Sequence, residues 1–344
     1  MSGASTADSL LSQFDALLFD LDGVVYVGPH AVPHAADAIR AAQEQGVACG
    51  FITNNASRSA QAVVDHLLEL GIPCTEADVI TSPQAAVSLL PQFVPDGSAV
   101  LVIGGSGIDD ALTARGYRPV RSLADAPAAV MQGFSPDVSW RDLAEATFAV
   151  RAGLPWIATN PDLTFPAPGG IAPGNGAFVR VVAETVGRGP DAVAGKPEPP
   201  LLHEAVARTC AQRPLMVGDR LDTDIAAGSR VGMPTLLVFT GVTTIAELLA
   251  AIPEERPTYL GPDLTVLGEP YPAVTIDGGH ARCGTATAHI DDGRLQVSVG
   301  DRLWDCVRAA AAVGWRAREG GILVDTSVAV AQLEDWRRDA SVLP

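Results

Sequence analysis

Short apolar runs alternate with amphipathic helical stretches along this chain, and the alternation restricts the possible folds more than any other feature. Four of the runs have the length of buried strands and lie at residues 16–19, 47–52, 191–195 and 214–218. Helical stretches follow three of them, at about residues 33–45, 59–70 and 199–210. This order predicts an α/β fold built on a doubly wound parallel sheet.

Polar side chains follow each of the four runs. In chain order they are Asp20 and Asp22, then Thr53 and Asn54, then Lys196, then Asp219 and Asp224. Ligands of doubly wound sheets bind beyond the carboxyl ends of the strands, so these groups are expected to converge. Each group alone is weak evidence, because Asp and Gly are ordinary turn residues after a strand. Four groups in order, each at a predicted strand end, together indicate a functional site.

The carboxylates among these residues suit phosphate chemistry. Asp20 and Asp219, with a backbone carbonyl, are the hard oxygen ligands that Mg²⁺ prefers. Carboxylates packed together repel one another unless a cation is present. A carboxylate that faces a phosphate beside such a cation can act as a nucleophile, and a second one two residues later is placed for proton transfer. Asp20 and Asp22 have this spacing.

Lys196 is the only lysine of the chain, and the other 22 of its 23 basic residues are arginines. Chance survival in an arginine-rich chain is one explanation. The other is a site that needs a compact ammonium group, which reaches one phosphate oxygen where the flat guanidinium fork is too wide. The net charge of −17 argues against nucleic acid as a partner, and it means that a phosphate substrate needs local cations.

These segments resemble the four motifs of the haloacid dehalogenase (HAD) superfamily of phosphotransferases. "DLDGV", "TNN", "GKP" and "GDRLDTD" occur in the order of that family. The long interval at residues 83–190 is where the superfamily inserts C2-type caps. Within it, "ATNPDLTFPAPGGIAPGNGAF" is similar to the NagD-like, para-nitrophenylphosphatase-like branch. The resemblance covers about residues 14–262, the region that holds the alternating strands and helices.

The resemblance implies a role for each acidic motif residue. Asp20 would be the nucleophile and a Mg²⁺ ligand. Asp22 would be the general acid and then the base for the attacking water, and its carbonyl would be a further metal ligand. Asp219 would ligate Mg²⁺, and Asp224 would position a metal-bound water.

The remaining motif residues would hold the phosphoryl group, and they are Thr53, Asn54, Asn55 and Lys196. Within the interval, residues 161–176 form a long loop rich in Pro and Gly, and such loops are usually functional. Asn160 and Asp162 lie at its head and are expected to face the catalytic centre as substrate-loop residues.

The resemblance and the composition together divide the chain. The expected parts are the first part of a HAD core at 1–82, an α/β C2-type cap at 83–190, the second part of the core at 191–262, and a small C-terminal α+β domain at 263–344. The cap is expected to be an independent domain with Trp140 and Trp156 in its core. The C-terminal part contains short strand-like runs followed by a helical stretch, and we interpret it as a dimerisation or regulatory module.

The expected function is a Mg²⁺-dependent phosphomonoesterase that hydrolyses a small phosphorylated metabolite through an aspartyl phosphate. The resemblance favours glycerol 3-phosphate, since arginine-rich chains with such a tail are similar to actinobacterial enzymes of that class. Phosphoglycolate, pyridoxal phosphate and nucleotides are alternatives, as are a phosphomutase and a non-catalytic regulatory module. Five scattered cysteines without metal spacing predict a cytoplasmic protein, and no apolar run predicts a membrane span. A homodimer is the expected assembly.

Overall fold

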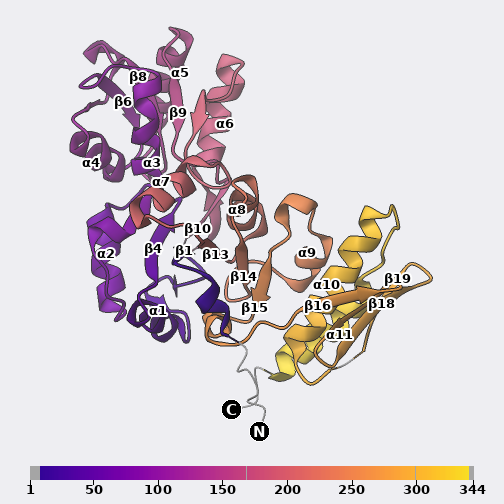
Figure 1. Cartoon of the computed structure of the whole chain (residues 1–344). Coiled ribbons are helices and arrows are strands. Elements are labelled where there is room, and N and C mark those ends of the chain that lie inside the picture. The colour runs from indigo at the N-terminus through magenta and orange to yellow at the C-terminus, as the bar shows by residue number, and fades with distance from the viewer. Residues whose placement is uncertain (1–7, 168, 299, 341–344) are drawn as a thin grey trace.

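The computed structural model describes residues 8–340 apart from 168 and 299, and its centre is a six-stranded sheet (Figure 1). In sheet order the strands are β15 (Tyr259–Gly261), β14 (Thr235–Val238), β13 (Pro214–Gly218), β1 (Ala16–Asp20), β4 (Ala48–Thr53) and β5 (Val79–Thr81). All neighbouring strands are parallel. β1 lies between β13 and β4, and its apolar residues are buried because both faces of the sheet are covered.

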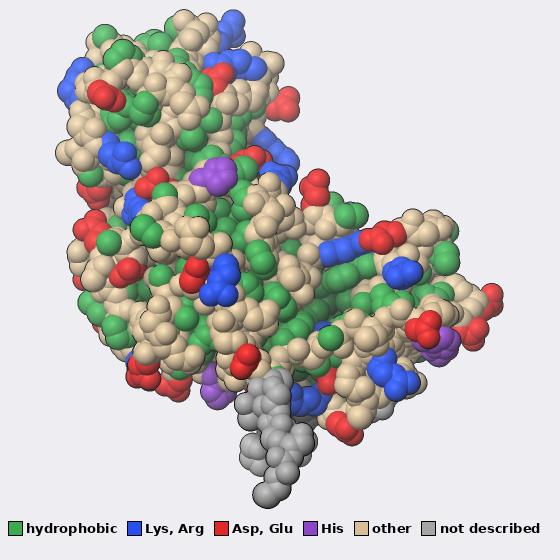
Figure 2. Space-filling view, in the orientation of Figure 1, with side chains coloured by type: hydrophobic (Ala, Val, Ile, Leu, Met, Phe, Trp, Pro, Cys, Tyr) green, Lys and Arg blue, Asp and Glu red, His purple; other side chains and the backbone are tan. Residues whose placement is uncertain are grey.

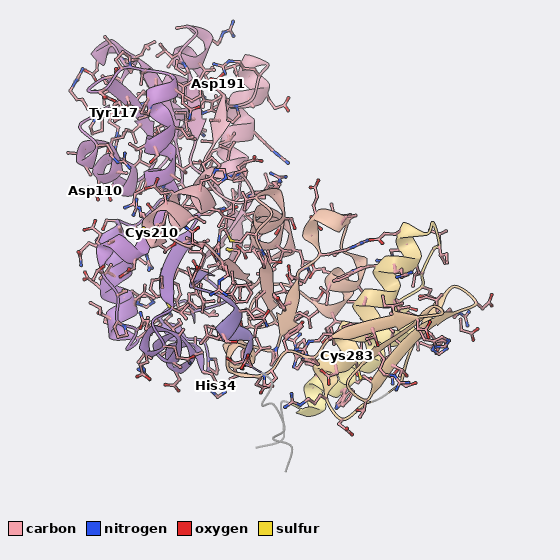
Figure 3. The ribbon with its side chains drawn as sticks, in the orientation of Figure 1. His34, Asp110, Tyr117, Asp191, Cys210 and Cys283 are labelled. Carbon is pink, nitrogen blue, oxygen red and sulfur yellow. The ribbon has the colours of Figure 1, made fainter. Side chains whose placement is uncertain are left out.

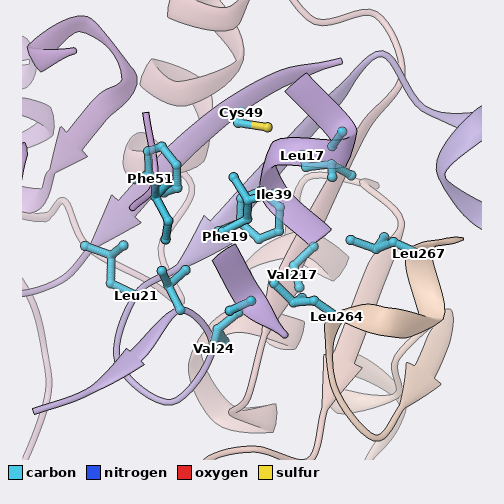
Figure 4. Packing of buried hydrophobic residues seen from close by; sticks show 14 of the residues in the cluster. Leu17, Phe19, Leu21, Val24, Ile39, Cys49, Phe51, Val217, Leu264 and Leu267 are labelled. Carbon is cyan, nitrogen blue, oxygen red and sulfur yellow. The ribbon is translucent and has the colours of Figure 1, made fainter. Parts of the chain in front are cut away.

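Helices cover both faces of this sheet. They are α1 (Ala35–Glu44), α2 (Ala60–Glu69), α3 (Ser82–Leu89), α7 (Pro200–Thr209), α8 (Ala226–Arg230) and α9 (Ile245–Ala250). The three predicted helices are confirmed to within two residues at each end. On one face, Leu17 and Phe19 of β1 pack with Ile39 of α1 and with Leu264 and Leu267 (Figure 4). Since the last two residues belong to this core, it continues beyond the expected boundary at 262.

The cap contains a second parallel sheet, at the top of Figure 1. Its strands, in sheet order, are β12 (Ala192–Val193), β9 (Trp156–Ala158), β8 (Ala129–Gln132), β6 (Ala99–Ile103) and β7 (Arg118–Val120). Its helices are α4 (Ser106–Ala114), α5 (Trp140–Arg151) and α6 (Asn175–Val186), and a hairpin pairs β10 (Thr164–Ala167) with β11 (Gly170–Pro173). The predicted inserted α/β cap is confirmed.

The strand that precedes Lys196 is a correction to the sequence analysis. β12 pairs with β9 of the cap and not with a strand of the central sheet. The expected cap boundary at 190 is therefore too early. A two-residue apolar strand has no pattern that identifies its partner sheet, and its pairing depends on where the chain crosses back from the cap.

The two tryptophans of the cap differ in burial. Trp156 is fully buried, and its indole N–H donates to Gln132 Oε1 at 3.1 Å. Trp140 is 79% exposed, so its expected place in the core was wrong. It is the first residue of α5, directly after the N-cap Ser139, and there its side chain faces solvent.

The cap shares an apolar cluster with the central sheet, although an independent domain was expected. The cluster joins Leu18 and Ile52 of the central sheet to Val102 and Met131 of the cap sheet. Side chains of α3, α4 and α7 fill the space between them, among them Leu201. This packing fixes the cap on the edge of the sheet that carries the polar residues.

The C-terminal part is an antiparallel sheet with two helices, to the right in Figure 1. Its elements are β16 (Val274–Asp277), β17 (His280–Cys283), β18 (Ala286–Asp291), β19 (Arg294–Ser298), α10 (Leu303–Glu319) and α11 (Ser327–Ala340). The predicted α+β architecture is confirmed, but α11 was not predicted from the sequence. Figure 3 labels Cys283 in this part and Cys210, which directly follows α7 in the central body.

Short elements complete the described chain. They are the 3-10 helices η1 (Leu10–Gln13), η2 (Glu76–Asp78), η3 (Leu90–Gln92), η4 (Leu123–Asp125), η6 (Pro253–Glu255) and η7 (Leu264–Gly268), the π-helical turn η5 (Leu221–Ile225), and the small strands β2 (Tyr26–Val27) and β3 (His30–Ala31). Among the described helices, none has both the length and the apolar character that crossing a membrane requires.

Candidate active site

The end of β1 and the turn after it present Asp20 and Asp22 at the carboxyl edge of the central sheet. The Gly23 N–H donates to the Tyr26 carbonyl at 2.8 Å and closes this turn. Gly23 has a φ of 89°, which favours glycine. A β-carbon there would also lie 2.6 Å from Asp219 Oδ2, so this position admits no larger residue. The glycine therefore lets the first motif approach the fourth.

Lys196 reaches the same place from the segment between β12 and α7. Its side chain is 2% exposed, and Nζ lies 2.5 Å from Asp20 Oδ1 and 2.7 Å from Asp224 Oδ1. One nitrogen thus contacts a carboxylate at the end of β1 and another in the helical turn that follows β13. This is the compact, single-point cation that the lone lysine suggested.

The loop after β13 holds Asp219 and Asp224 in different ways. Asp224 Oδ2 accepts hydrogen bonds from the backbone N–H groups of Asp219 and Arg220, at 3.2 and 3.1 Å. Asp219 Oδ2 accepts from the Val242 N–H at 2.7 Å, whereas its Oδ1 is buried and accepts no hydrogen bond from the described protein. A β-carbon on Gly218 would lie 2.1 Å from that of Asp224, so glycine is required for the loop to close.

The carboxylates of Asp20, Asp219 and Asp224 place one ligand oxygen each within 4.8 Å of the others. Burial raises the pKa of Asp20 well above its usual range, the Lys196 charge opposes this, and the two other carboxylates add to the rise. Burial, and then Asp224, raise the pKa of Asp219 to about 7. A single lysine leaves this cluster with excess negative charge. A divalent cation with oxygen ligands fits it, because the free Asp219 Oδ1 would then gain a partner.

Asp22 lies at the open side of the site. Its side chain is exposed over part of its surface, yet protein surrounds the rest, and the resulting loss of solvation raises the pKa of Asp22. The positive charge of Arg58 opposes this rise. Arg58 lies in the loop after β4 and was missed by the sequence analysis. The only indication of Arg58 in the sequence is its position as a basic residue shortly after "TNN".

Thr53 at the end of β4 and the two asparagines after it make hydrogen bonds within the protein. Thr53 Oγ1 accepts from the Asn55 N–H at 3.0 Å. Asn54 Nδ2 donates to the Lys196 carbonyl at 2.9 Å and to both oxygens of Asp162, at 3.1 and 3.2 Å. Asn54 Oδ1 accepts from the Lys196 N–H at 2.8 Å. Because its amide group is occupied by protein partners, the Asn54 side chain connects three segments of the site.

The two candidates from the cap loop lie against this junction. Asn160 is 2% exposed, donates through Nδ2 to the Asn54 carbonyl at 2.7 Å, and accepts from the Asp162 N–H at 3.2 Å. The Asn175 side chain donates to the Asn160 carbonyl at 2.8 Å. Asp162 is half-buried, and burial raises its pKa. The structure therefore brings both residues to the site, and Asn160 lies within its wall.

Comparisons with known proteins agree with this geometry. A model of the haloacid dehalogenase-like hydrolases matches residues 17–118, and a second model of HAD-like hydrolases matches residues 193–267. The D-glycerol 3-phosphate phosphatase of Mycobacterium tuberculosis is 42% identical over 319 residues, which cover 90% of this chain and 88% of the relative.

The chain belongs to the haloacid dehalogenase-like hydrolase family.

Other members of the HAD family match a smaller part of the chain. The acid sugar phosphatase of Staphylococcus aureus is 35% identical over 240 residues, which cover 69% of this chain and 91% of the relative. Since these relatives are phosphatases, the prediction of a HAD phosphoric monoester hydrolase is confirmed.

Solved structures of HAD phosphatases have the same fold. A glycerol phosphate phosphatase from M. tuberculosis in complex with magnesium superposes with a TM-score of 0.83 at 40% identity, and the match covers 96% of this chain and 98% of that one. The p-nitrophenyl phosphatase from Archaeoglobus fulgidus has a TM-score of 0.69 at 28% identity, with 74% and 98% covered. The predicted para-nitrophenylphosphatase-like branch is thereby confirmed.

Proposed function

We propose that this protein is a Mg²⁺-dependent phosphomonoesterase that hydrolyses glycerol 3-phosphate through a phosphorylated Asp20. The observation that carries the proposal is the contact of Asp20 with Lys196 inside a cluster of three carboxylates, with Asp22 on the same turn. A nucleophile, a cation and an acid thus meet at one end of β1, as attack on a phosphoester requires.

In the first step, an Asp20 oxygen attacks phosphorus while the bond between phosphorus and the substrate's alcohol oxygen breaks. Asp22 donates its proton to that oxygen, so the alcohol leaves neutral. In the second step, Asp22 takes a proton from water, and the water oxygen attacks the phosphorus held on Asp20. The bond between phosphorus and Asp20 breaks, which releases inorganic phosphate and restores both carboxyl groups.

Lys196 balances charge through both steps. Its ammonium is buried between Asp20 and Asp224, where it neutralises the nucleophile and faces the incoming phosphoryl oxygens. Asp224 accepts backbone hydrogen bonds with one oxygen and pairs with Lys196 through the other. We therefore assign Asp224 mainly to positioning the lysine and the loop of Asp219.

Mg²⁺ would be held by carboxylate oxygens of Asp20 and Asp219 and by the Asp22 carbonyl, and the carboxylate cluster fits it. When bound, it would neutralise negative charge on the phosphoryl group. Thr53 and the backbone N–H groups after β4 and β1 would donate to the phosphoryl oxygens. Asn54 would act by positioning Lys196 rather than through its own side-chain donors.

Glycerol 3-phosphate is the proposed substrate because of how far the similarity extends. The match to the glycerol phosphate phosphatases covers 90% of this chain in sequence and 96% in structure, so it includes the C-terminal part. The sugar and p-nitrophenyl phosphatases match only 69 and 74% of it. The small substrate also suits a site that a whole domain covers.

A panel of phosphoesters tests the proposal. Purified enzyme with Mg²⁺ is assayed for phosphate release from both enantiomers of glycerol 3-phosphate, phosphoglycolate, pyridoxal 5′-phosphate and a nucleoside monophosphate. The highest kcat/KM is expected for glycerol 3-phosphate, and Asp20→Asn is expected to release none. A higher kcat/KM for another ester would make that ester the preferred substrate in place of glycerol 3-phosphate. Turnover by Asp20→Asn would contradict the assignment of Asp20 as the nucleophile.

The same assay separates the phosphatase from a phosphomutase. A mutase would pass the phosphoryl group from Asp20 to a second alcohol, so product ester would form without an equal amount of free phosphate. The homodimer and the cytoplasmic location stay predictions. Light scattering on the purified protein and fractionation of cells test them.

A further inference from the structure

One loop connects the candidate active site to the rest of the molecule on its β14 side. The loop at residues 239–243 follows β14. The Val242 N–H donates to Asp219 Oδ2 at 2.7 Å, and the Thr240 hydroxyl donates to the Gly23 carbonyl at 2.5 Å. A β-carbon on Gly241 would lie only 1.9 Å from Asp219 Oδ2. The position of this loop therefore determines where the Asp219 carboxylate lies.

The C-terminal part holds the first residue of that loop. Arg337 of α11 donates to the Phe239 carbonyl at 2.8 Å, and its guanidinium lies 5.7 Å from the centre of the Phe239 ring. Trp304 of α10 packs on the same ring with centroids 4.8 Å apart. Phe239 is 4% exposed, so both contacts are made in a nearly closed environment. Two helices from the end of the chain thus fix the base of a loop that touches the active site.

The C-terminal part also contacts α9, the helix that follows this loop. At the start of α9, Glu334 Oε1 accepts from the Ile245 N–H at 3.4 Å. At its end, the Trp315 indole donates to the Leu248 carbonyl at 3.0 Å, and Arg318 donates to the Leu249 carbonyl. The last carbonyls of a helix have no partner within the helix, so these donors stabilise its end.

Apolar side chains also connect the C-terminal part to the neighbourhood of the candidate active site. Leu221 and Ile225, the first and last residues of the η5 turn that contains Asp224, belong to one apolar cluster with Leu248 of α9 and Val307 of α10. Figure 2 shows apolar side chains over the junction between the central body and the C-terminal part. Through this cluster, η5, which follows Asp219, and α9, which follows the loop 239–243, both pack against the C-terminal part.

We propose that the C-terminal part positions the catalytic centre, with Arg337 and Trp304 as positioning residues that fix the loop 239–243 and through it the Asp219 carboxylate. This inference rests on the proposed function and gives the C-terminal part a role in Mg²⁺ binding, in place of the dimerisation or regulatory role that its sequence suggested. Groups that support a metal ligand usually affect metal affinity when they are removed.

The test compares variants of the full-length enzyme. Arg337→Met keeps the aliphatic stem and removes the donor, whereas Arg337→Lys keeps a charged donor. Arg338→Met is the control, since Arg338 is on the same helix and forms an ion pair with Asp335 at 3.1 Å. Mg²⁺ affinity is measured by calorimetry without substrate, and phosphate release is measured across Mg²⁺ concentrations. Thermal unfolding reports on folding.

Arg337→Met is expected to weaken Mg²⁺ binding about tenfold, the lower end for groups that support metal ligands. Much of its activity should return at saturating Mg²⁺, Arg337→Lys should recover most of the affinity, and Arg338→Met should match the wild type. Unchanged Mg²⁺ affinity in Arg337→Met, or an equal loss in Arg338→Met, would overturn the proposal. If Arg337→Met does not fold, Trp304→Leu provides the same comparison, and wild-type Mg²⁺ affinity in that variant would overturn it as well.

The calorimetry separates this inference from the proposed function. A wild-type enzyme that binds Mg²⁺ but hydrolyses no ester would contradict the proposed function and leave the positioning role measurable. A wild-type enzyme that hydrolyses glycerol 3-phosphate, with Arg337→Met equal to it in Mg²⁺ affinity, would contradict the positioning role alone.

Discussion

Replacement of Lys196 is the sharpest test of how the site balances its charge. The ammonium is 2% exposed and contacts Asp20 at 2.5 Å and Asp224 at 2.7 Å, within a cluster that also contains Asp219. Lys196→Met keeps the length of the side chain and removes the charge. Removal of one partner from a buried ion pair costs about 3–5 kcal/mol. If the transition state requires this contact, kcat/KM falls roughly 10²- to 10⁴-fold.

Lys196→Arg keeps the charge and changes its shape. The guanidinium is a planar fork, and the space beside Lys196 accommodates one nitrogen between two carboxylates. Overpacking of a buried site costs about 1–3 kcal/mol. We expect a loss of about 1.4 kcal/mol in transition-state stabilisation, which is about tenfold in kcat/KM.

The assay is phosphate release from glycerol 3-phosphate at saturating Mg²⁺, with thermal unfolding to establish that each variant is folded. The order expected for kcat/KM is wild type, then Lys196→Arg, then Lys196→Met. Near-normal kinetics in Lys196→Arg would refute the reasoning, because the lone lysine would then be an accident of composition. Equal losses in both variants would mean that shape matters and charge does not.

Three further predictions concern other parts of the molecule. Asp22→Asn should lower kcat/KM for an alkyl phosphate roughly 10²- to 10⁴-fold. The loss should be smaller for para-nitrophenyl phosphate, because its leaving group needs little protonation. Equal losses on the two esters would exclude Asp22 as the general acid. Gly241→Ala should abolish most Mg²⁺-dependent turnover because its β-carbon would lie 1.9 Å from Asp219 Oδ2, whereas Gly268→Ala, where a β-carbon meets nothing within 4 Å, should keep wild-type rates. Gly314 lies inside α10, and a β-carbon there would also meet no atom within 4 Å. Gly314→Ala should therefore raise the free energy of unfolding, measured by urea denaturation, by about 0.5–1 kcal/mol. A decrease would contradict the free space that the structure gives this position.

The proximity of the acidic motif residues could be predicted from the sequence because their positions follow local rules. Apolar runs of strand length were each followed by polar side chains, and the carboxyl ends of parallel strands lie along one edge. Asp20 ends β1 and Asp219 directly follows the neighbouring strand β13, so their meeting depends only on strand order. The spacing of Asp20 and Asp22 across a turn is local as well.

Other features depended on which segments meet, and no local pattern encodes that. β12 joined the cap sheet because its two residues lie where the chain returns from the cap. Asn54 has the composition of a phosphate donor, but the cap loop supplies Asp162 as a partner for its amide. Trp140 is apolar, but its position at the start of α5 leaves it in solvent.

The sequence by itself therefore determined the type of sheet and the class of chemistry, and it brought forward the residues that we propose as catalytic, because each of these arises from periodicity and short spacing. Only the tertiary structure decided how those residues are supported. Arg337 contacts Phe239 across 98 residues of chain, and the loop that follows reaches the Asp219 carboxylate through the backbone N–H of Val242, a donor that every residue except proline carries. Contacts of that kind depend on the packing of α10 against α9 and β15 and of α11 against α9, and packing is settled only when the whole chain has folded.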